Sequence, residues 1–281
     1  MDAQRLMELA DFWPGRILLT ANDLGFFPHL QIPRSAEEIA DIGGGLDVES
    51  TSRILKALTA MEILVLKNGR YEIAAELKEP LGDGGNTILP SLTHRSNLWI
   101  IWSELTEIVR TGKHYDALVK PRPQTEERQQ EFSRAMAVVG KGVAAETAHA
   151  IDFSGIQRVL DIGGAPAIYA GEFLKIKPDL HIFILDRPGA NEIVDEMTAG
   201  THAEEKIGFI EGDALQIEDS NVIGKNGSGR FDMIFMSNLI HSMSPDEIKE
   251  LFTRCVRWCA PGGRILVKDF LMDDTRTIPA R

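Results

Sequence analysis

The stretch "VLDIGGAPAIYAGEFL", residues 159–174, joins an apolar run to a glycine turn and then to a helical pattern. The apolar run leads into Asp161, and Gly163 and Gly164 follow. A strand, a glycine-bearing loop and a helix in this order are typical of the first unit of a nucleotide-binding α/β fold. The loop nevertheless lacks the Gly-x-Gly-x-x-Gly spacing of dinucleotide sites, and Pro166 stands inside it. The question is therefore which ligand suits such a loop.

From about residue 157 the chain alternates between apolar runs and helical stretches or loops. The runs, in order, are "RVLDIGG", "HIFILDRP", "KIGFIEGDA", "FDMIFMSNLIH" and "GRILVKDFL". Such alternation predicts a parallel, doubly wound sheet. Ligands of these sheets bind beyond the carboxyl ends of the strands, so the acids that close the runs are the candidates for binding and chemistry.

The acids at the strand ends favour a nucleoside ligand without phosphate. Asp186 closes the second run, where an acid typically accepts hydrogen bonds from the ribose hydroxyls, and Asp213 closes the third, near an expected adenine amine. Pyrophosphate needs free backbone N–H groups, but Pro166 has none and Asp161 would repel the anion. A ligand that combines adenine, ribose, a cationic amine and a sulfonium fits better. We therefore predict S-adenosylmethionine as the cofactor.

The first 90 residues predict a different unit. Ser35 and Glu38 form a capping-box pattern, a second helical pattern covers about 47–61, and Asn68-Gly69 is a strong hairpin signal between two short strands. Helix, turn, helix and hairpin predict a winged helix. Such a module binds DNA or serves dimerisation and packing, and the few cations of its second helix disfavour DNA.

Composition narrows the classes of function. The 281 residues carry a formal net charge of -12, which argues against a general affinity for nucleic acid. The N-terminus does not have the basic start and apolar core that are typical of a signal peptide. No apolar run approaches the roughly 20 residues that are needed to cross a bilayer. We expect a cytoplasmic protein that does not bind membranes. Cys255 and Cys259 are predicted on one face of one helix as thiols without a catalytic role, and no metal site is expected.

Residues 157–281 resemble the class I S-adenosylmethionine-dependent methyltransferases. With its front part, the whole chain is similar to the dimeric small-molecule O-methyltransferases of plants and bacteria. Their first motif, Asp-x-Gly-Gly-Gly-x-Gly, matches Asp161 to Ala167 except for alanine at 165 and 167. The resemblance implies an α/β fold, in which a Rossmann-like parallel sheet over 151–281 follows a helical winged-helix dimerisation domain over 1–90. A helical connector over 91–150 is expected to contribute to the substrate pocket.

The resemblance also implies site residues. Expected cofactor-binding residues are Asp161, Gly163, Gly164, Asp186, Arg187, Asp213, Ala214, Ser237 and Asn238. Expected residues of the substrate pocket are Met136 and Met243. Trp102 is also a candidate for the pocket: it lies three residues after Trp99 on a predicted helix, where core packing is the alternative for the pair. Two departures from the family are Gly140, where a serine is usual, and Ser242-Met243, which replace the usual Asp-Trp after a histidine. The nature of the acceptor is therefore not readable from that segment.

His241 is the candidate catalytic base. It follows the fourth apolar run, and Ser244 with Glu247 forms a capping box just after it, so His241 is expected on an exposed loop. Position alone leaves a purely structural histidine as the alternative. The resemblance implies that His241 takes the proton from a small-molecule hydroxyl during direct displacement, and that Asp269 orients its ring in place of the usual glutamate.

The end of the sequence raises three alternatives. The chain stops soon after the fifth apolar run, where the resembled enzymes continue with a helix and two further strands. We weigh a fragment of a longer enzyme, a second chain that supplies the remainder, and a protein that keeps the cofactor but has lost methyl transfer. Two rival classes also stay open. One is a methyltransferase-fold enzyme that hydroxylates, decarboxylates or rearranges its substrate, and the other is a regulator built on the winged helix.

Overall fold

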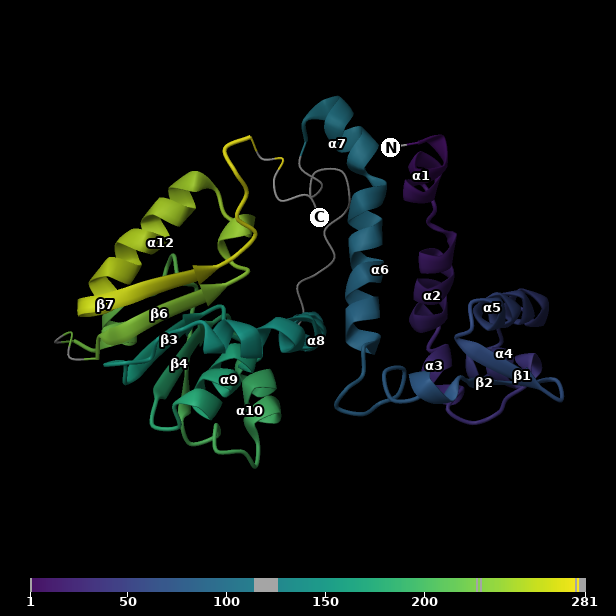
Figure 1. Cartoon of the computed structure of the whole chain (residues 1–281), viewed down its shortest axis with the longest axis horizontal. Coiled ribbons are helices and arrows are strands. Elements are labelled where there is room, and N and C mark those ends of the chain that lie inside the picture. The colour runs from purple at the N-terminus through teal and green to yellow at the C-terminus, as the bar shows by residue number, and fades with distance from the viewer. Residues whose placement is uncertain (1, 114–125, 226, 228, 276, 278–281) are drawn as a thin grey trace. The chain divides into compact units, whose positions relative to one another are not determined.

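The computed structural model describes residues 2–113, 126–225, 227, 229–275 and 277. The chain divides into two compact units, Met1–Pro123 and Gln124–Arg281 (Figure 1). The segment predicted as a connector, 91–150, is shared between them, because the division falls at 123/124. No helix in the described part of the chain has both the length and the apolar character that a membrane crossing requires.

The N-terminal unit is helical, with one small hairpin. Its elements are α1 (Ala3–Leu9), α2 (Trp13–Asp23), α3 (Phe26–His29), α4 (Ala36–Ile42), α5 (Val48–Ala60), β1 (Leu64–Lys67), β2 (Arg70–Ile73), the 3-10 turn η1 (Ala75–Leu77), α6 (Leu89–Ser103) and α7 (Leu105–Thr111). The predicted capping box is confirmed, since Ser35 and Glu38 close the N-terminus of α4 reciprocally. β1 and β2 pair antiparallel around Asn68-Gly69, as predicted, with positive φ at both turn residues.

The core of this unit is buried, whereas its helix α1 is exposed. Phe26, Leu55 and Leu58 are buried between α3 and α5, and Trp99 of α6 packs against the same cluster. None of the residues of α1 is buried, and Leu6 is 60% exposed. Because a helix of this length is not stable alone in water, its apolar residues call for a partner surface.

The C-terminal unit contains a five-stranded sheet. Its elements are α8 (Glu126–His149), β3 (Arg158–Ile162), α9 (Ile168–Ile176), β4 (His181–Asp186), α10 (Asn191–Thr198), β5 (Ile207–Glu211), α11 (Asp219–Ile223), β6 (Phe231–Ser237), the 3-10 turn η3 (Ile240–Ser242), α12 (Pro245–Trp258) and β7 (Cys259–Lys268). The strand order is β5-β4-β3-β6-β7 and every pairing is parallel. The five predicted strands and the parallel sheet are confirmed. The order reverses direction beside β3, where such sheets bind ligands.

Two layers of helices cover the sheet. Successive side chains of a strand point to opposite faces of the sheet. Val159 therefore packs on the face covered by α8, α9 and α10, and Leu160 packs on the face covered by α11 and α12. Figure 1 shows α12 on one side of the sheet and α9 and α10 on the opposite side. Phe173 of α9 and Trp258 of α12 are fully buried anchors of these two layers. The sheet is therefore shielded on both faces, and its carboxyl edge is where side chains meet a cavity.

The prediction that both cysteines lie on one helix is wrong. Cys255 is buried in α12, but the helix ends at Trp258 and Cys259 has the extended conformation of the first residue of β7. The Pro261-Gly262 pair that follows does not support a longer helix. Burial raises the pKa of the Cys255 thiol to about 12, which agrees with an unreactive thiol.

Candidate active site

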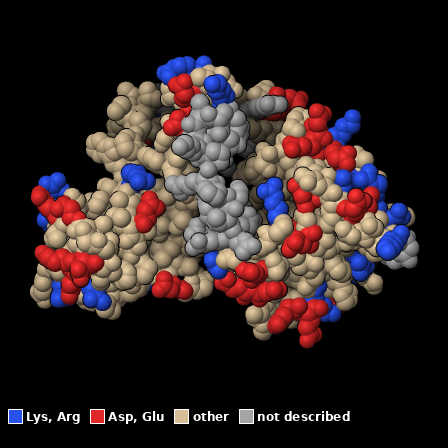
Figure 2. Space-filling view, turned by 180° about the vertical axis from the view of Figure 1, so that it is seen from behind, with Lys and Arg blue, Asp and Glu red and all other residues tan. Residues whose placement is uncertain are grey.

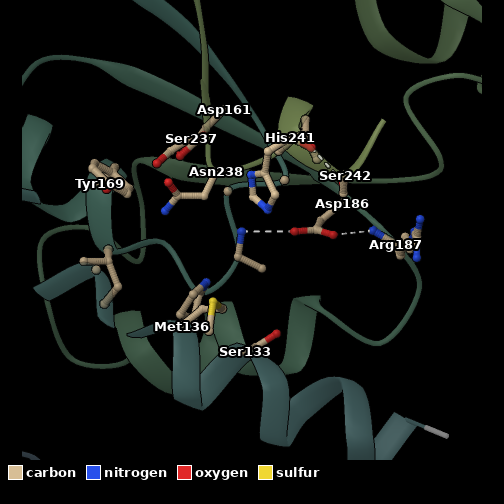
Figure 3. A pocket seen from close by; sticks show the side chains of 17 residues that line it. Ser133, Met136, Asp161, Tyr169, Asp186, Arg187, Ser237, Asn238, His241 and Ser242 are labelled. Carbon is tan, nitrogen blue, oxygen red and sulfur yellow. Dashed lines mark hydrogen bonds between the residues drawn. The ribbon is translucent and has the colours of Figure 1, made fainter. Parts of the chain in front are cut away.

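A cavity of about 310 Å³ opens at the carboxyl ends of β3, β4 and β6 and is closed on one side by α8 (Figure 3). Its lining residues are Ser133, Met136, Gly140, Asp161, Gly163, Gly164, Ala165, Pro166, Ile168, Tyr169, Asp186, Arg187, Ser237, Asn238, Leu239, His241 and Ser242. The volume falls at the lower end of the range for small-molecule sites.

Two N–H groups of the loop after β3 are hydrogen-bonded within the protein. The N–H of Ala165 donates to Oδ2 of Asp186 at 3.1 Å, and the N–H of Ala167 donates to the carbonyl of Gly164 at 2.7 Å. Pro166 has no N–H to offer. Two N–H groups of this loop are therefore occupied by the protein itself, and position 166 offers none.

Asp161 lies beneath this loop and is only 1% exposed. A Cβ atom added to Gly164 would lie 2.4 Å from Cγ of Asp161, so glycine is needed for the carboxyl to fit. Desolvation, reinforced by the charge of Asp186, raises the pKa of Asp161 well above its usual value. Oδ2 of Asp161 has no hydrogen-bond partner in the described structure. This carboxyl group is therefore available to a ligand.

Asp186 is the last residue of β4 and is held by two backbone donors. Oδ2 accepts from the N–H of Ala165, and Oδ1 accepts from the N–H of Arg187 at 2.8 Å. Burial raises the pKa of Asp186, although both N–H groups and the Arg187 guanidinium act in the opposite direction. The carboxylate is thus fixed in position and retains lone pairs for a hydroxyl donor.

His241 lies in the short turn η3 after β6, and its ring faces the cavity (Figure 3). Nδ1 of His241 lies 2.8 Å from Oδ1 of Asp269. A carboxylate only accepts hydrogen bonds, so the neutral ring carries its proton on Nδ1 and presents Nε2 as an acceptor. The ring is 44% exposed, so a hydroxyl compound can reach it.

Asp269, directly after β7, orders the loop that carries His241. Its Oδ2 accepts from the backbone N–H groups of Leu239, Ile240 and His241 at 3.0, 2.9 and 3.3 Å. Its side chain is 2% exposed. Burial favours a higher pKa for Asp269, but the hydrogen bonds from the Phe270 N–H and the His241 ring outweigh it, and the pKa is lowered. Asp269 is therefore an anchored anion that orients the imidazole.

The structure brings together most of the predicted site residues. Those on the cavity wall are Met136, Asp161, Gly163, Gly164, Asp186, Arg187, Ser237, Asn238 and His241, with Asp269 behind His241. Four others do not line this cavity. Trp102 lies on α6 in the N-terminal unit and is 66% exposed. Asp213 turns back to accept from the N–H of Leu215 at 2.8 Å, while Ala214 and Met243 pack on the α12 side of the sheet.

Sequence reasoning missed three polar residues of the wall: Ser133, Tyr169 and Ser242. Tyr169 is the second residue of α9, and Ser133 of α8 is 2% exposed. The signal for Tyr169 is its position one turn after a glycine loop, where a helix faces the ligand. No sequence signal distinguishes Ser133 from an ordinary helical serine.

A parallel sheet in this order, with a glycine loop after its first strand and acids at the strand ends, defines a class I methyltransferase fold. Residues 102–281 match the O-methyltransferase domain family. The chain therefore belongs to the O-methyltransferase family, whose enzymes depend on S-adenosylmethionine.

Relatives agree along nearly the whole chain. Acetylserotonin O-methyltransferase of Macaca mulatta is 24% identical over 285 residues, which cover 95% of this chain and 80% of the relative. Mitomycin biosynthesis 6-O-methyltransferase of Streptomyces lavendulae is 25% identical over 276 residues, covering 93% and 75%. Human N-acetylserotonin methyltransferase, solved in complex with SAM, has a TM-score of 0.79 at 22% identity, covering 99% of this chain and 83% of that one.

Proposed function

We propose that this protein transfers a methyl group from S-adenosylmethionine to a hydroxyl group of a small, aromatic molecule, with His241 as the general base. The observation that carries the proposal is the pair formed by His241 and Asp269 on the wall of the cavity. The Nε2 atom of His241 is an oriented proton acceptor beside the carboxyl edge of a methyltransferase sheet.

The residues of the cavity fit the cofactor. Asp186 offers a fixed carboxylate for ribose hydroxyls at the end of β4. Asp161 offers a buried carboxyl group without a partner, which suits a ligand with positive charge. The bound cofactor supplies an electrophilic methyl group on a sulfonium. The loop after β3, in which two N–H groups are already bonded and position 166 has none, suits a cofactor without phosphate.

The protein's own groups then have distinct tasks. Nε2 of His241 accepts the proton of the acceptor hydroxyl, which makes the oxygen a better nucleophile. Asp269 retains the Nδ1 proton and stabilises the imidazolium that results. Met136 and Ile168 line the cavity with apolar surface, which limits water around the reacting oxygen.

Two features support a small-molecule acceptor. The cavity is of small-molecule size and mixes apolar and polar lining. The relatives named above are called acetylserotonin O-methyltransferase and mitomycin biosynthesis 6-O-methyltransferase, and both names point to a small-molecule acceptor. The charge of the chain argues against nucleic acid as the acceptor, since its 42 acidic residues outnumber its 30 basic ones. On the face drawn in Figure 2, the Lys and Arg side chains are scattered among Asp and Glu.

The proposal is tested with methyl-labelled S-adenosylmethionine and a panel of phenols, naphthols and hydroxyindoles. We expect labelled methyl ethers from the wild-type chain and a loss of about 10²–10⁴ in rate for His241→Gln. Calorimetric affinity for S-adenosylhomocysteine should stay unchanged in this variant. His202→Gln, a histidine of the same unit whose ring contacts the Pro178 carbonyl, is the matched control and should keep full activity.

The outcomes separate the candidate functions. If His241→Gln methylates at the wild-type rate, His241 is not the base. If the wild type binds the cofactor and converts an acceptor without transferring label, a non-methylating reaction replaces our proposal. Specific binding of NAD instead of the adenosyl compounds would overturn the cofactor assignment.

We also infer that residues 1–90 form a winged-helix dimerisation domain, with the helices of 91–150 contributing to the acceptor pocket and 151–281 binding the cofactor. Helix α1 supports dimerisation, because Leu6, Met7 and Leu9 are 60%, 71% and 62% exposed. Helix α2 begins beside two more exposed rings, Phe12 and Trp13. A contiguous apolar surface of this kind is typical of subunit contacts.

A further inference from the structure

Phe270, the second residue after β7, places an aromatic ring against the candidate base. Its ring centroid lies 5.5 Å from that of His241, and the two ring planes meet at 78°. Aromatic pairs favour such edge-to-face contacts, with centroids about 4.5–7 Å apart. Phe270 is not one of the residues that line the cavity at the carboxyl edge of the sheet, whereas His241 is. His241 therefore faces that cavity and contacts Phe270 at the same time.

The backbone fixes Phe270 in this position. The N–H of Phe270 donates to Oδ1 of Asp269 at 2.8 Å, and the same oxygen lies 2.8 Å from Nδ1 of His241. The N–H of Leu271 donates to the carbonyl of Asp269 at 3.0 Å. One carboxylate oxygen thus ties the two aromatic residues to each other. Because the bonds of residues 270 and 271 are made by backbone N–H groups, a change of the Phe270 side chain leaves them available.

The rings of both residues are open to solvent. Phe270 is 57% exposed, and the side chain of His241 is 44% exposed. Leu271 and Met272, which follow, are 66% and 53% exposed, so three consecutive large apolar side chains lie at the surface next to the base. Burial of apolar surface is favourable, and contiguous apolar surface of this kind is typical of a binding site.

The position of Phe270 indicates that its partner is the acceptor. A hydroxyl group that donates to Nε2 of His241 lies within about 3.2 Å of that atom. The part of the acceptor that carries this hydroxyl is therefore next to the imidazole ring, which Phe270 contacts. A phenyl ring favours a flat aromatic partner over an aliphatic one, because aromatic pairs are stabilised beyond the area that they bury.

We propose that Phe270 determines the specificity for the acceptor: its ring forms one side of the acceptor site and selects flat, aromatic hydroxyl compounds, those with fused rings most strongly. This inference rests on the proposed function and names a residue that selects the acceptor. The contact is made before methyl transfer and persists during it. It therefore strengthens the binding of the acceptor and leaves the rate of the chemical step nearly unchanged.

The test compares the steady-state methylation of 2-naphthol, which has two fused rings, and of phenol, which has one, at saturating S-adenosylmethionine. We expect Phe270→Leu to raise KM for 2-naphthol about three- to tenfold and KM for phenol less, with kcat within about twofold of wild type. Phe270→Trp restores a flat ring and should recover most of the lost affinity. Phe252→Leu makes the same change at a partly buried residue of α12 and is the matched control, expected to change neither constant.

A titration without turnover provides a second measurement. 2-Naphthol is titrated by calorimetry into protein that is saturated with S-adenosylhomocysteine, and Phe270→Leu should weaken its binding by the same factor as it raises KM. If kcat falls equally with both acceptors while KM stays constant, Phe270 only orients His241 and the inference is overturned. Wild-type constants for Phe270→Leu would overturn it as well.

The remaining outcomes separate this inference from the proposed function. If Phe270→Leu leaves KM unchanged and halves the mass measured by light scattering, the exposed ring serves a subunit contact and the inference fails. If the wild type methylates aliphatic hydroxyl compounds as well as it methylates 2-naphthol, methyl transfer stands and the selection by Phe270 falls. If the wild type transfers no methyl group to any hydroxyl compound, the proposed function fails first and the inference with it.

Discussion

The carboxylate of Asp269 accepts hydrogen bonds from two sets of donors. At the scale of a residue, Asp269→Asn therefore tests whether this carboxylate orients His241. Oδ2 binds three backbone N–H groups while Oδ1 binds the ring of His241. An amide has only one acceptor oxygen. If the oxygen faces the backbone, the NH₂ group meets Nδ1 and forces the proton to Nε2, which removes the base. If it faces His241, the loop loses its anchor.

For Asp269→Asn we therefore expect a fall of about 10²–10⁴ in turnover with phenolic acceptors. Affinity for S-adenosylhomocysteine measured by calorimetry should change much less, because Asp269 does not line the cavity. Asp269→Glu keeps a carboxylate and is expected to retain part of the activity. A variant with asparagine at 269 and wild-type turnover would contradict the role assigned to this carboxylate.

Asp161 should make stability depend on pH. Its pKa in the folded chain is raised above the usual 3.8, so the folded state binds the proton more tightly than the unfolded state. The stability that this proton contributes is complete below the unfolded pKa and is lost as pH rises through the folded pKa. Asparagine carries no such charge, so Asp161→Asn should become more stable relative to wild type as pH rises.

We expect a gain of about 1–2 kcal/mol in the free energy of unfolding of Asp161→Asn at neutral pH and above, and a smaller one in acid, without ligand. Urea unfolding at several pH values measures it. Asp195→Asn changes an exposed acid of α10 and should show no such trend. If the two variants respond alike, the surroundings of Asp161 do not raise the pKa of its carboxyl group.

At the scale of elements, regular local patterns were predictable from the sequence. Apolar runs closed by acids predicted the five strands, and the Ser35–Glu38 pair predicted the start of α4. The wrong prediction for Cys259 depended on tertiary detail, because the end of α12 is set by the following Pro-Gly segment and by pairing with β6. The hydrogen bond that Asp213 accepts from the Leu215 N–H is a detail of the loop after β5 that the sequence pattern does not reveal. The place of Tyr169 on the cavity wall was not predictable from the sequence, because a single aromatic residue in an apolar helix is typical of core packing.

The strand–loop–helix unit of β3 and α9 tolerates a methyl group at one glycine and not at another. At Gly164 a Cβ would lie 2.4 Å from Cγ of Asp161, whereas at Gly171 in α9 nothing lies within 4 Å. Gly164→Ala should therefore displace Asp161, destabilise the unit by about 1–3 kcal/mol and weaken S-adenosylhomocysteine binding. Gly171→Ala should stabilise the helix by about 0.5–1 kcal/mol. Thermal unfolding and calorimetry of both variants decide this, and equal behaviour would refute the close packing.

At the scale of the whole molecule, the sequence predicts three parts, over 1–90, 91–150 and 151–281, and the chain divides into two compact units. The division at 123/124 falls inside the polar, proline-bearing stretch "KPRPQTEERQQ" of residues 120–130, whose composition is typical of a linker. Contacts assign α6 and α7 to one unit and α8 to the other. The cavity belongs entirely to the second unit. The exposed apolar side chains of the first unit, Leu6, Met7 and Leu9 among them, favour self-association as one of its roles.

Helix α1 gives that role a direct test. Its apolar side chains include Leu6 and Leu9, both at least 60% exposed, and water alone does not stabilise a helix of this length. If two chains bury these residues against each other, light scattering after gel filtration should give about twice the 31.1 kDa mass of the chain. Leu6→Glu combined with Leu9→Glu should shift the protein to the monomer, because carboxylates in an apolar contact lose their water without gaining a partner. Val256→Glu, at a residue 67% exposed on α12, is the control and should leave the mass unchanged. A wild-type chain that stays monomeric at micromolar concentration, or a double variant that stays dimeric, would place the contact elsewhere or remove it.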